Sequence, residues 1–258
     1  MPREEIFSII EGKGAVIATA IHTGHGMRAS LQGRSKLTSM QQLREEDPFT
    51  DIFASAVSSR IIATQSRFQI DFNRPRERAV YRVPEDAWGL ELWKAPLPSE
   101  EVDCSLQEYD AFYAALKEML DQKLKTHKQI VVLDIHSYNH RRRGEREPFD
   151  DPMQNPEINI GTGTMSDRGK WQESIALVTD RLKDAVVMGR HLDVRENIKF
   201  QGGEMAQWIH THYPKTVCCI SLEFKKFFMN EWNGKGEMTA INEIKEVIGE
   251  IADFLETI

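Results

Sequence analysis

The stretch that decides the fold is Ile130-Val-Val-Leu-Asp-Ile135, a run of apolar and β-branched residues. Such a run is typical of a strand that is buried on both faces of a sheet. Residues 14–21 (Gly-Ala-Val-Ile-Ala-Thr-Ala-Ile) and 216–222 (Thr-Val-Cys-Cys-Ile-Ser-Leu) have the same character, and residues 60–65 and 68–72 are strand-like but more mixed. We therefore expect a central sheet whose inner strands are covered on both sides.

Amphipathic helices are predicted around these strands. Ser105-Leu-Gln-Glu108 is a capping-box sequence that opens a helical pattern. Apolar residues recur at helical spacing over 171–182 and 205–212, and a last stripe covers 241–258, with Thr239 as its predicted N-cap. Buried strands that alternate with such helices indicate an α/β protein, specifically a three-layer α/β/α sandwich. Ligands of such sheets bind beyond the carboxyl ends of the strands, so functional residues are expected there.

Composition narrows the class of protein. The 258 residues contain no linker-like stretch, which predicts one domain over 1–258. Forty acidic and 33 basic residues give a net charge of −7, which argues against a nucleic-acid-binding surface. No apolar run approaches the roughly 20 residues of a membrane span. The N-terminus lacks a secretory signal and the three cysteines are an odd number, so we expect a cytoplasmic protein without a disulfide scaffold.

Histidines follow two of the predicted strands. His22-Thr-Gly-His25 comes after the first buried run, and two imidazoles three residues apart in a glycine turn can bind one metal ion. The alternative is a turn whose histidines only cap the chain or face solvent. His136 follows the second buried run, and Asp134 lies on the same side of that strand, where it could orient the imidazole. Two such strand ends in one sheet predict a metal site with an open position.

A carboxylate, Glu223, ends the third buried run. Burial of a carboxylate is costly unless the group has a partner or a function. Beside a metal-bound water it would act as a general base; the alternative is an ion pair with Lys225 or Lys226.

Residues 67–74, Arg-Phe-Gln-Ile-Asp-Phe-Asn-Arg, form a polar constellation. In an extended strand, alternation places every second residue on one face: Arg67, Gln69, Asp71 and Asn73. Arginine and asparagine both suit a carboxylate ligand. The alternative is a simple surface salt bridge between Asp71 and Arg74.

The order of these motifs resembles the N-formylglutamate amidohydrolase family. The resemblance extends from about Ile17 to Trp232 and includes Asp71-x-Asn-Arg-Pro, Asp134-x-His-Ser-Tyr and Ile160-Gly161. That family is similar in fold to zinc carboxypeptidases and aspartoacylase, which implies a phosphorylase/hydrolase-like sandwich with a mixed sheet.

The resemblance also implies roles for individual residues. It implies one zinc ion on His22 and His136, with Glu223 as the catalytic carboxylate. It further implies that Asn73 and Arg74 bind the carboxylate of the substrate and that Arg67 polarises the scissile carbonyl. Carboxypeptidases and aspartoacylase have His-x-x-Glu where this chain has His22-x-x-His25, so His25 is the expected third ligand. The alternative is an Asp or Glu elsewhere that the sequence does not identify.

A basic loop, His140-Arg-Arg-Arg-Gly-Glu-Arg146, follows His136 closely. One interpretation is a solvated loop balanced by nearby acidic residues. The other is that Arg141 or Arg142 binds a substrate carboxylate.

Together these features predict a zinc-dependent amidohydrolase that acts on a small carboxylate substrate, with N-formyl-glutamate as the first candidate. A deacylase or carboxypeptidase-like hydrolase of another N-acyl amino acid or short peptide is the alternative within the enzymes. A non-catalytic protein that binds an anionic metabolite is the alternative from another class. The oligomeric state is not predicted.

Overall fold

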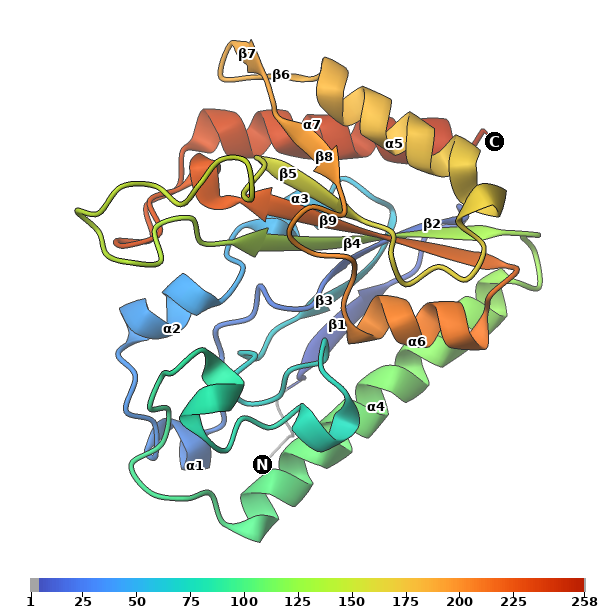
Figure 1. The fold of residues 1–258 in the computed structure, drawn as a ribbon. Coiled ribbons are helices and arrows are strands. Elements are labelled where there is room, and N and C mark those ends of the chain that lie inside the picture. The colour runs from blue at the N-terminus through green and yellow to red at the C-terminus, as the bar shows by residue number, and fades with distance from the viewer. Residues whose placement is uncertain (1–4, 258) are drawn as a thin grey trace.

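A seven-stranded mixed sheet forms the centre of the molecule (Figure 1). The structure is a computed structural model that describes residues 5–257, so Ile258 of the last predicted stripe and the first four residues of the N-terminal segment lie outside it. The strands lie in the order β1-β3-β2-β4-β9-β5-β8. Their bounds are β1 Phe7–Ile10, β2 Val16–Ala20, β3 Ser59–Ala63, β4 Ile130–Tyr138, β5 Ile158–Gly161, β8 Val194–Glu196 and β9 Val217–Lys225. β1 is antiparallel to β3 and β5 is antiparallel to β9, while the inner strands β3, β2, β4 and β9 are parallel.

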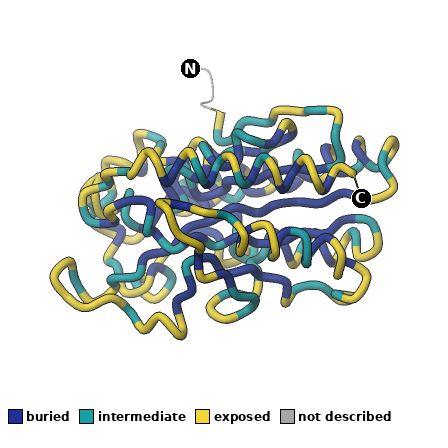
Figure 2. Tube along the Cα trace, turned by 90° about the horizontal axis from the view of Figure 1, so that it is seen from above, coloured by how far each residue is buried: buried dark blue, intermediate teal, exposed yellow. Residues whose placement is uncertain are grey.

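Helices cover both faces of this sheet. One face carries α3 (Thr50–Ala54), α5 (Gln172–Asp184) and α7 (Met238–Leu255), and the other carries α4 (Ser99–Lys123) and α6 (Glu204–His212) (Figure 1). Figure 2 shows buried chain in the middle and exposed residues on the outer sides of the helices. The predicted three-layer α/β/α sandwich is confirmed.

The apolar run 130–135 explains this arrangement. Along β4, Leu133 and Ile135 pack with the α3, α5 and α7 side, whereas Ile130 and Val132 pack with the α4 and α6 side. A strand with apolar side chains on both faces is stable only between two layers of helices, because either face would otherwise be exposed to water.

Shorter elements connect these layers. They are α1 Ala29–Gln32, α2 Ser39–Glu45, a separate hairpin of β6 Val186–Val187 and β7 Arg190–His191, and the 3₁₀ turns η1 Arg76–Arg78, η2 Pro84–Ala87, η3 Arg168–Trp171 and η4 Lys226–Phe228. Within residues 5–257, no helix combines the length and apolar character that crossing a membrane requires.

Three local predictions were wrong. Residues 68–72 form turns instead of a strand, because the Asp71 carboxylate accepts a hydrogen bond from the Asn73 N–H at 2.8 Å and bends the chain. Helix α4 begins at Ser99, so the capping-box Ser105 is internal and its hydroxyl accepts a hydrogen bond from Arg28 at 2.8 Å. The N-cap of α7 is Glu237 and not Thr239.

Two strands extend further than their apolar runs suggest. β4 continues through His136 to Tyr138, and β9 continues through Glu223 to Lys225. In the parallel register of the two strands, His136 is the direct partner of Glu223. The strands themselves therefore place an imidazole next to a carboxylate at the same edge of the sheet.

Candidate metal centre and active site

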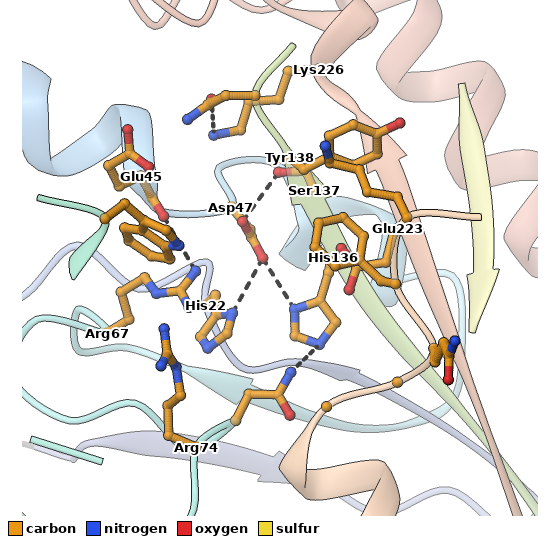
Figure 3. Close-up of a pocket in the computed structure, with 18 of the residues that line it drawn as sticks. His22, Glu45, Asp47, Arg67, Arg74, His136, Ser137, Tyr138, Glu223 and Lys226 are labelled. Carbon is orange, nitrogen blue, oxygen red and sulfur yellow. Dashed lines mark hydrogen bonds and ion pairs between the residues drawn. The ribbon is translucent and has the colours of Figure 1, made fainter. Parts of the chain in front are cut away.

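Two histidines and an aspartate converge at the carboxyl ends of the inner strands (Figure 3). His22 follows β2, His136 lies in β4, and Asp47 lies between α2 and α3. Oδ2 of Asp47 is 3.5 Å from Nδ1 of His22 and 3.2 Å from Nδ1 of His136. All three residues are buried, and their ligand atoms lie within 4.8 Å of one another. The cluster has the donor types and the spacing of a site for one metal ion.

The other nitrogen of each imidazole faces a second carboxylate. Nε2 of His22 lies 2.7 Å from Oδ1 of Asp71, and Nε2 of His136 lies 3.0 Å from Oδ1 of Asp134. Carboxylates in these positions hold the proton on Nε2 and leave both Nδ1 atoms free to bind a metal ion. Asp134 is therefore located where the sequence places it, beside the imidazole that it is expected to orient.

Electrostatics favour a cation at this point. Burial alone would raise the pKa of Asp47, but hydrogen bonds from His136 and His22 hold it well below its ordinary value. Burial would lower the pKa of His136, but Asp134 and Asp47 raise it well above the ordinary value for histidine. Carboxylates that hold a proton on His136 in this way also attract a metal cation, which would replace that proton.

The structure does not bring His25, the predicted third ligand, into the cluster. Nδ1 of His25 lies 2.6 Å from Oε2 of Glu46 and Nε2 lies 2.9 Å from the hydroxyl of Ser39, and 42% of the side chain is exposed. Gly24 lies so close to the backbone of Gln65 that an added Cβ would be 2.4 Å from its oxygen, and the His25 side chain after it lies beside α2 instead of beside His22.

Asp47 occupies the position expected for His25. The sequence has an acidic triplet, Glu45-Glu46-Asp47, and nothing in it distinguishes the three carboxylates. The distinction arises from tertiary contacts, because the Asp47 N–H donates to the carbonyl of His22 at 2.9 Å and ties the loop to the end of β2. Asp47 fits the alternative prediction, in which the third ligand is an Asp or Glu elsewhere in the chain.

A cavity of about 370 Å³ opens beside the three metal-binding groups. Its wall includes Glu223 together with residues of the predicted substrate site: Arg67, Asn73, Arg74 and Arg142. Burial raises the pKa of Glu223 to about 7, and the neighbouring Asp47 and Asp134 carboxylates act in the same direction. A carboxylate with this pKa exchanges a proton readily near neutral pH.

The two arginines of the turn segment face the cavity from one side. Arg67 donates to Oδ2 of Asp71 at 2.7 Å, and its guanidinium lies 4.9 Å from the ring centroid of Trp88. Arg74 lies 3.9 Å from the same Asp71 oxygen, and its guanidinium lies 5.3 Å from the Tyr81 ring. Asp71 therefore contacts His22 and both arginines and couples the metal centre to the cationic wall.

The basic loop divides between two places. Arg142 lines the cavity and forms an ion pair with Glu45 at 2.7 Å. Arg141 lines a separate hollow and stacks on Phe149 at 4.2 Å, so the structure does not bring this predicted substrate-binding residue to the cavity. The two neighbours diverge because the Arg141 guanidinium donates back to the carbonyl of Glu145 within the loop.

The comparisons with known proteins agree with this geometry. The chain matches the sequence model of the family described as N-formylglutamate amidohydrolase over residues 14–229. It belongs to the N-formylglutamate amidohydrolase family.

Solved structures share the fold. An N-formylglutamate amidohydrolase from Ralstonia eutropha JMP134 superposes with a TM-score of 0.76 at 17% identity, over 97% of this chain and 98% of that chain. The gene product Atu2144 from Agrobacterium tumefaciens gives 0.64 at 18% identity, over 97% and 96%. No curated protein matches the sequence.

Proposed function

We propose that this protein is a zinc-dependent amidohydrolase that cleaves the amide bond of a small N-acyl amino acid, with N-formyl-glutamate as the first candidate. The observation that carries the proposal is the His22–Asp47–His136 cluster beside Glu223 in one cavity. Family membership supports the reaction class.

His22, Asp47 and His136 would hold the zinc ion. Two neutral imidazoles and one carboxylate form a donor set found in catalytic zinc sites, with a further coordination position open to ligands. A zinc ion bound there would polarise the substrate carbonyl and lower the pKa of a bound water molecule. The Asp71 and Asp134 carboxylates behind the imidazoles keep the Nδ1 atoms directed toward that ion.

Glu223 would act as general base and then as general acid. Its carboxylate accepts a proton from the attacking water and later donates it to the nitrogen of the leaving amine. Burial, which raises its pKa to about 7, suits both steps, because the group can exist in either protonation state near neutral pH. Its register opposite His136 keeps it next to the metal centre.

Arg67 would stabilise the oxyanion, and Asn73 with Arg74 would bind the α-carboxylate of the substrate. Arg67 is held rigidly by Asp71 and Tyr81, as a preorganised donor must be. The side-chain oxygen of Asn73 accepts a hydrogen bond from the Met205 N–H at 3.0 Å, which leaves its amide nitrogen directed toward the site. Arg74 supplies the charge that a desolvated carboxylate requires.

The experiment is a hydrolysis assay with zinc-loaded and chelator-treated protein on N-formyl, N-acetyl and longer N-acyl amino acids. We expect amine release by the zinc form alone. If N-formyl-glutamate is inert and another N-acyl amino acid is cleaved, the deacylase alternative replaces the first candidate. If zinc binds stoichiometrically and nothing is cleaved, the hydrolase proposal fails and a binding protein remains.

A further inference from the structure

Five cationic side chains line the cavity, and they differ in whether their charge is already paired: Arg67, Arg74, Arg142, Lys199 and Lys226. The three arginines each lie within 4.0 Å of a carboxylate. Lys226 is buried and donates to two carbonyls and to Asn139, so its three N–H bonds are all used. Lys199 differs from the other four, because among the described residues it has neither a carboxylate within ion-pair distance nor a full set of hydrogen bonds. Within residues 5–257 its Nζ donates only to the Asn155 amide oxygen, at 2.6 Å.

Lys199 lies across the metal centre from Arg74. In the sheet, Glu223 on β9 pairs with His136 on one side and with Asn159 of β5 on the other. The Asn159 side-chain oxygen accepts a hydrogen bond from the Lys199 N–H at 2.8 Å, which fixes Lys199 on the β5 side.

Arg74 follows β3, on the opposite side of the central strands. Figure 3 shows the same order: Arg67 and Arg74 lie on one side of His22 and His136, and Glu223 and Tyr138 lie on the other. The Lys199 ammonium belongs to the Tyr138 side, because it lies 5.2 Å from the centroid of the Tyr138 ring.

The surroundings of Lys199 suit an anion that arrives from solvent. The residue is exposed, and its ammonium lies 5.6 Å from the Phe200 ring as well as close to Tyr138. Partial burial lowers the pKa of Lys199, and the Arg142 charge acts in the same direction. The Asp150 and Glu223 carboxylates act in the opposite direction, but the pKa stays below its ordinary value. A carboxylate placed at this ammonium would form a charge-assisted hydrogen bond with donors that have no charged partner.

We propose that Lys199 binds a carboxylate at the far end of the acyl group, so that among the N-acyl amino acids of the proposed function the protein prefers one acylated by a dicarboxylic acid to N-formyl-glutamate. The inference rests on the proposed function, in which Asn73 and Arg74 bind the α-carboxylate on the amine side. With the scissile carbonyl at the metal centre, the part of the substrate that extends past Glu223 toward Lys199 is the acyl chain. A formyl group has no atoms to reach it.

The first test compares two substrates of nearly the same shape. N-succinyl-alanine has a terminal carboxylate, and N-succinamoyl-alanine has an uncharged amide in its place. For Lys199→Met we expect kcat/KM to fall by roughly 10- to 100-fold on the acid, mainly through KM, and by less than about 3-fold on the amide. Lys199→Arg, which keeps the charge, should recover most of the loss. An equal loss on both substrates, or no loss, overturns the proposal.

A second pair locates the carboxylate. N-formyl-glutamate and N-formyl-glutamine differ only in the charge of the side chain on the amine side. We expect Lys199→Met to leave their ratio of kcat/KM unchanged. A selective loss on N-formyl-glutamate would place Lys199 on the amine side and overturn the assignment to the acyl side.

A binding measurement separates this inference from the proposed function. Calorimetric titration of the zinc-loaded protein with succinate and with butanoate requires no turnover. We expect the wild type to bind succinate more tightly than butanoate and Lys199→Met to lose that preference. If the preference is present but no N-acyl amino acid is hydrolysed, the function fails and the carboxylate site stands. If the wild type shows no preference, the carboxylate site fails, whatever the protein hydrolyses.

Discussion

The site is built from two kinds of chain, and they differ in how firmly the fold holds them. His136 and Glu223 lie inside β4 and β9, where a nine-residue parallel register sets their positions. Asp47, Arg142 and Lys199 lie in segments between regular elements, where a few hydrogen bonds and ion pairs set their positions. The ladder of backbone hydrogen bonds between β4 and β9 holds the strand-borne groups in place when a neighbouring side chain is changed. Loop-borne groups depend on a few polar contacts, so the candidate metal ligand Asp47 and the proposed substrate contacts are the sensitive part of the site.

The largest effect should come from a strand-borne group. Glu223→Gln keeps the shape of the side chain and removes the base, so we expect kcat to fall by about 10²- to 10⁴-fold while zinc content and folding are unchanged. Steady-state kinetics with metal analysis by mass spectrometry tests this. An unchanged kcat would mean that Glu223 is not the general base, and the mechanism would lose the step that this strand residue supplies.

The next effect separates the loop ligand from the histidine that the sequence favours. Asp47→Ala should weaken zinc binding by more than the roughly 10- to 100-fold that follows loss of an outer-shell partner. His25→Ala should change it by less than about 3-fold, because both ring nitrogens of His25 contact Glu46 and Ser39 instead. Competition with a zinc-binding dye measures both constants. The reverse order of the two variants would restore His25 as a ligand and contradict the geometry.

The strand scaffold also predicts a dependence of stability on pH. His210 of α6 is buried, its Nε2 accepts the N–H of Cys219 in β9 at 3.0 Å, and burial lowers its pKa to about 4. The unfolded chain therefore binds a proton that the native state excludes. The stability that neutral His210 contributes is complete above pH 6.5. It is lost as the pH falls toward 4, which lowers the free energy of unfolding by roughly 3 kcal/mol.

Urea denaturation at several pH values tests this in a matched pair. His210→Gln should flatten the decline between pH 6.5 and 4, whereas His212→Gln, an exposed position on the same helix, should not. Equal slopes for the wild type and His210→Gln would show that His210 is not held neutral against β9.

The same division explains what the sequence could predict. The apolar runs around Ile130 and Val217 identify buried strands, and a polar residue at the end of such a run is visible without any structure. His22, His136 and Glu223 were found for that reason. Asp47 was not, because its role depends on the contact with the carbonyl of His22, which no local pattern records.

The substrate wall shows the same limit. Alternation along a strand was expected to place Arg67, Gln69, Asp71 and Asn73 on one face. Instead, Arg67 and Arg74 line the cavity from a turn that the Asp71 carboxylate shapes. The turn brings these residues to the cavity by another route than the predicted strand, and their roles in substrate binding stay a prediction. Lys199 carried no signal, because it lies in no motif and becomes distinctive only when the pairing of the other cations is known. The single domain over 1–258 stays a prediction.

The smallest expected effect tests whether a loop of the site can tolerate change. Arg141 and Arg142 are adjacent, yet only Arg142 lines the cavity, and its charge is neutralised by Glu45. Because the Arg142 charge is already paired with Glu45, we expect Arg142→Ala to raise KM by only about 3- to 10-fold. The increase arises because Glu45 would keep only its ion pair with Arg44, at 2.7 Å, and would repel an anionic substrate. Arg141→Ala, which loses a stacking contact on Phe149 outside the cavity, should leave KM within about 2-fold. The check is KM for one N-acyl amino acid measured in both variants at low and at 0.3 M salt. The Arg142 effect should shrink at high salt, since an exposed charge is screened. A larger effect at Arg141 than at Arg142 would mean that the loop rearranges around the substrate. The loop-borne part of the site would then move on binding, whereas the strand-borne part stays fixed.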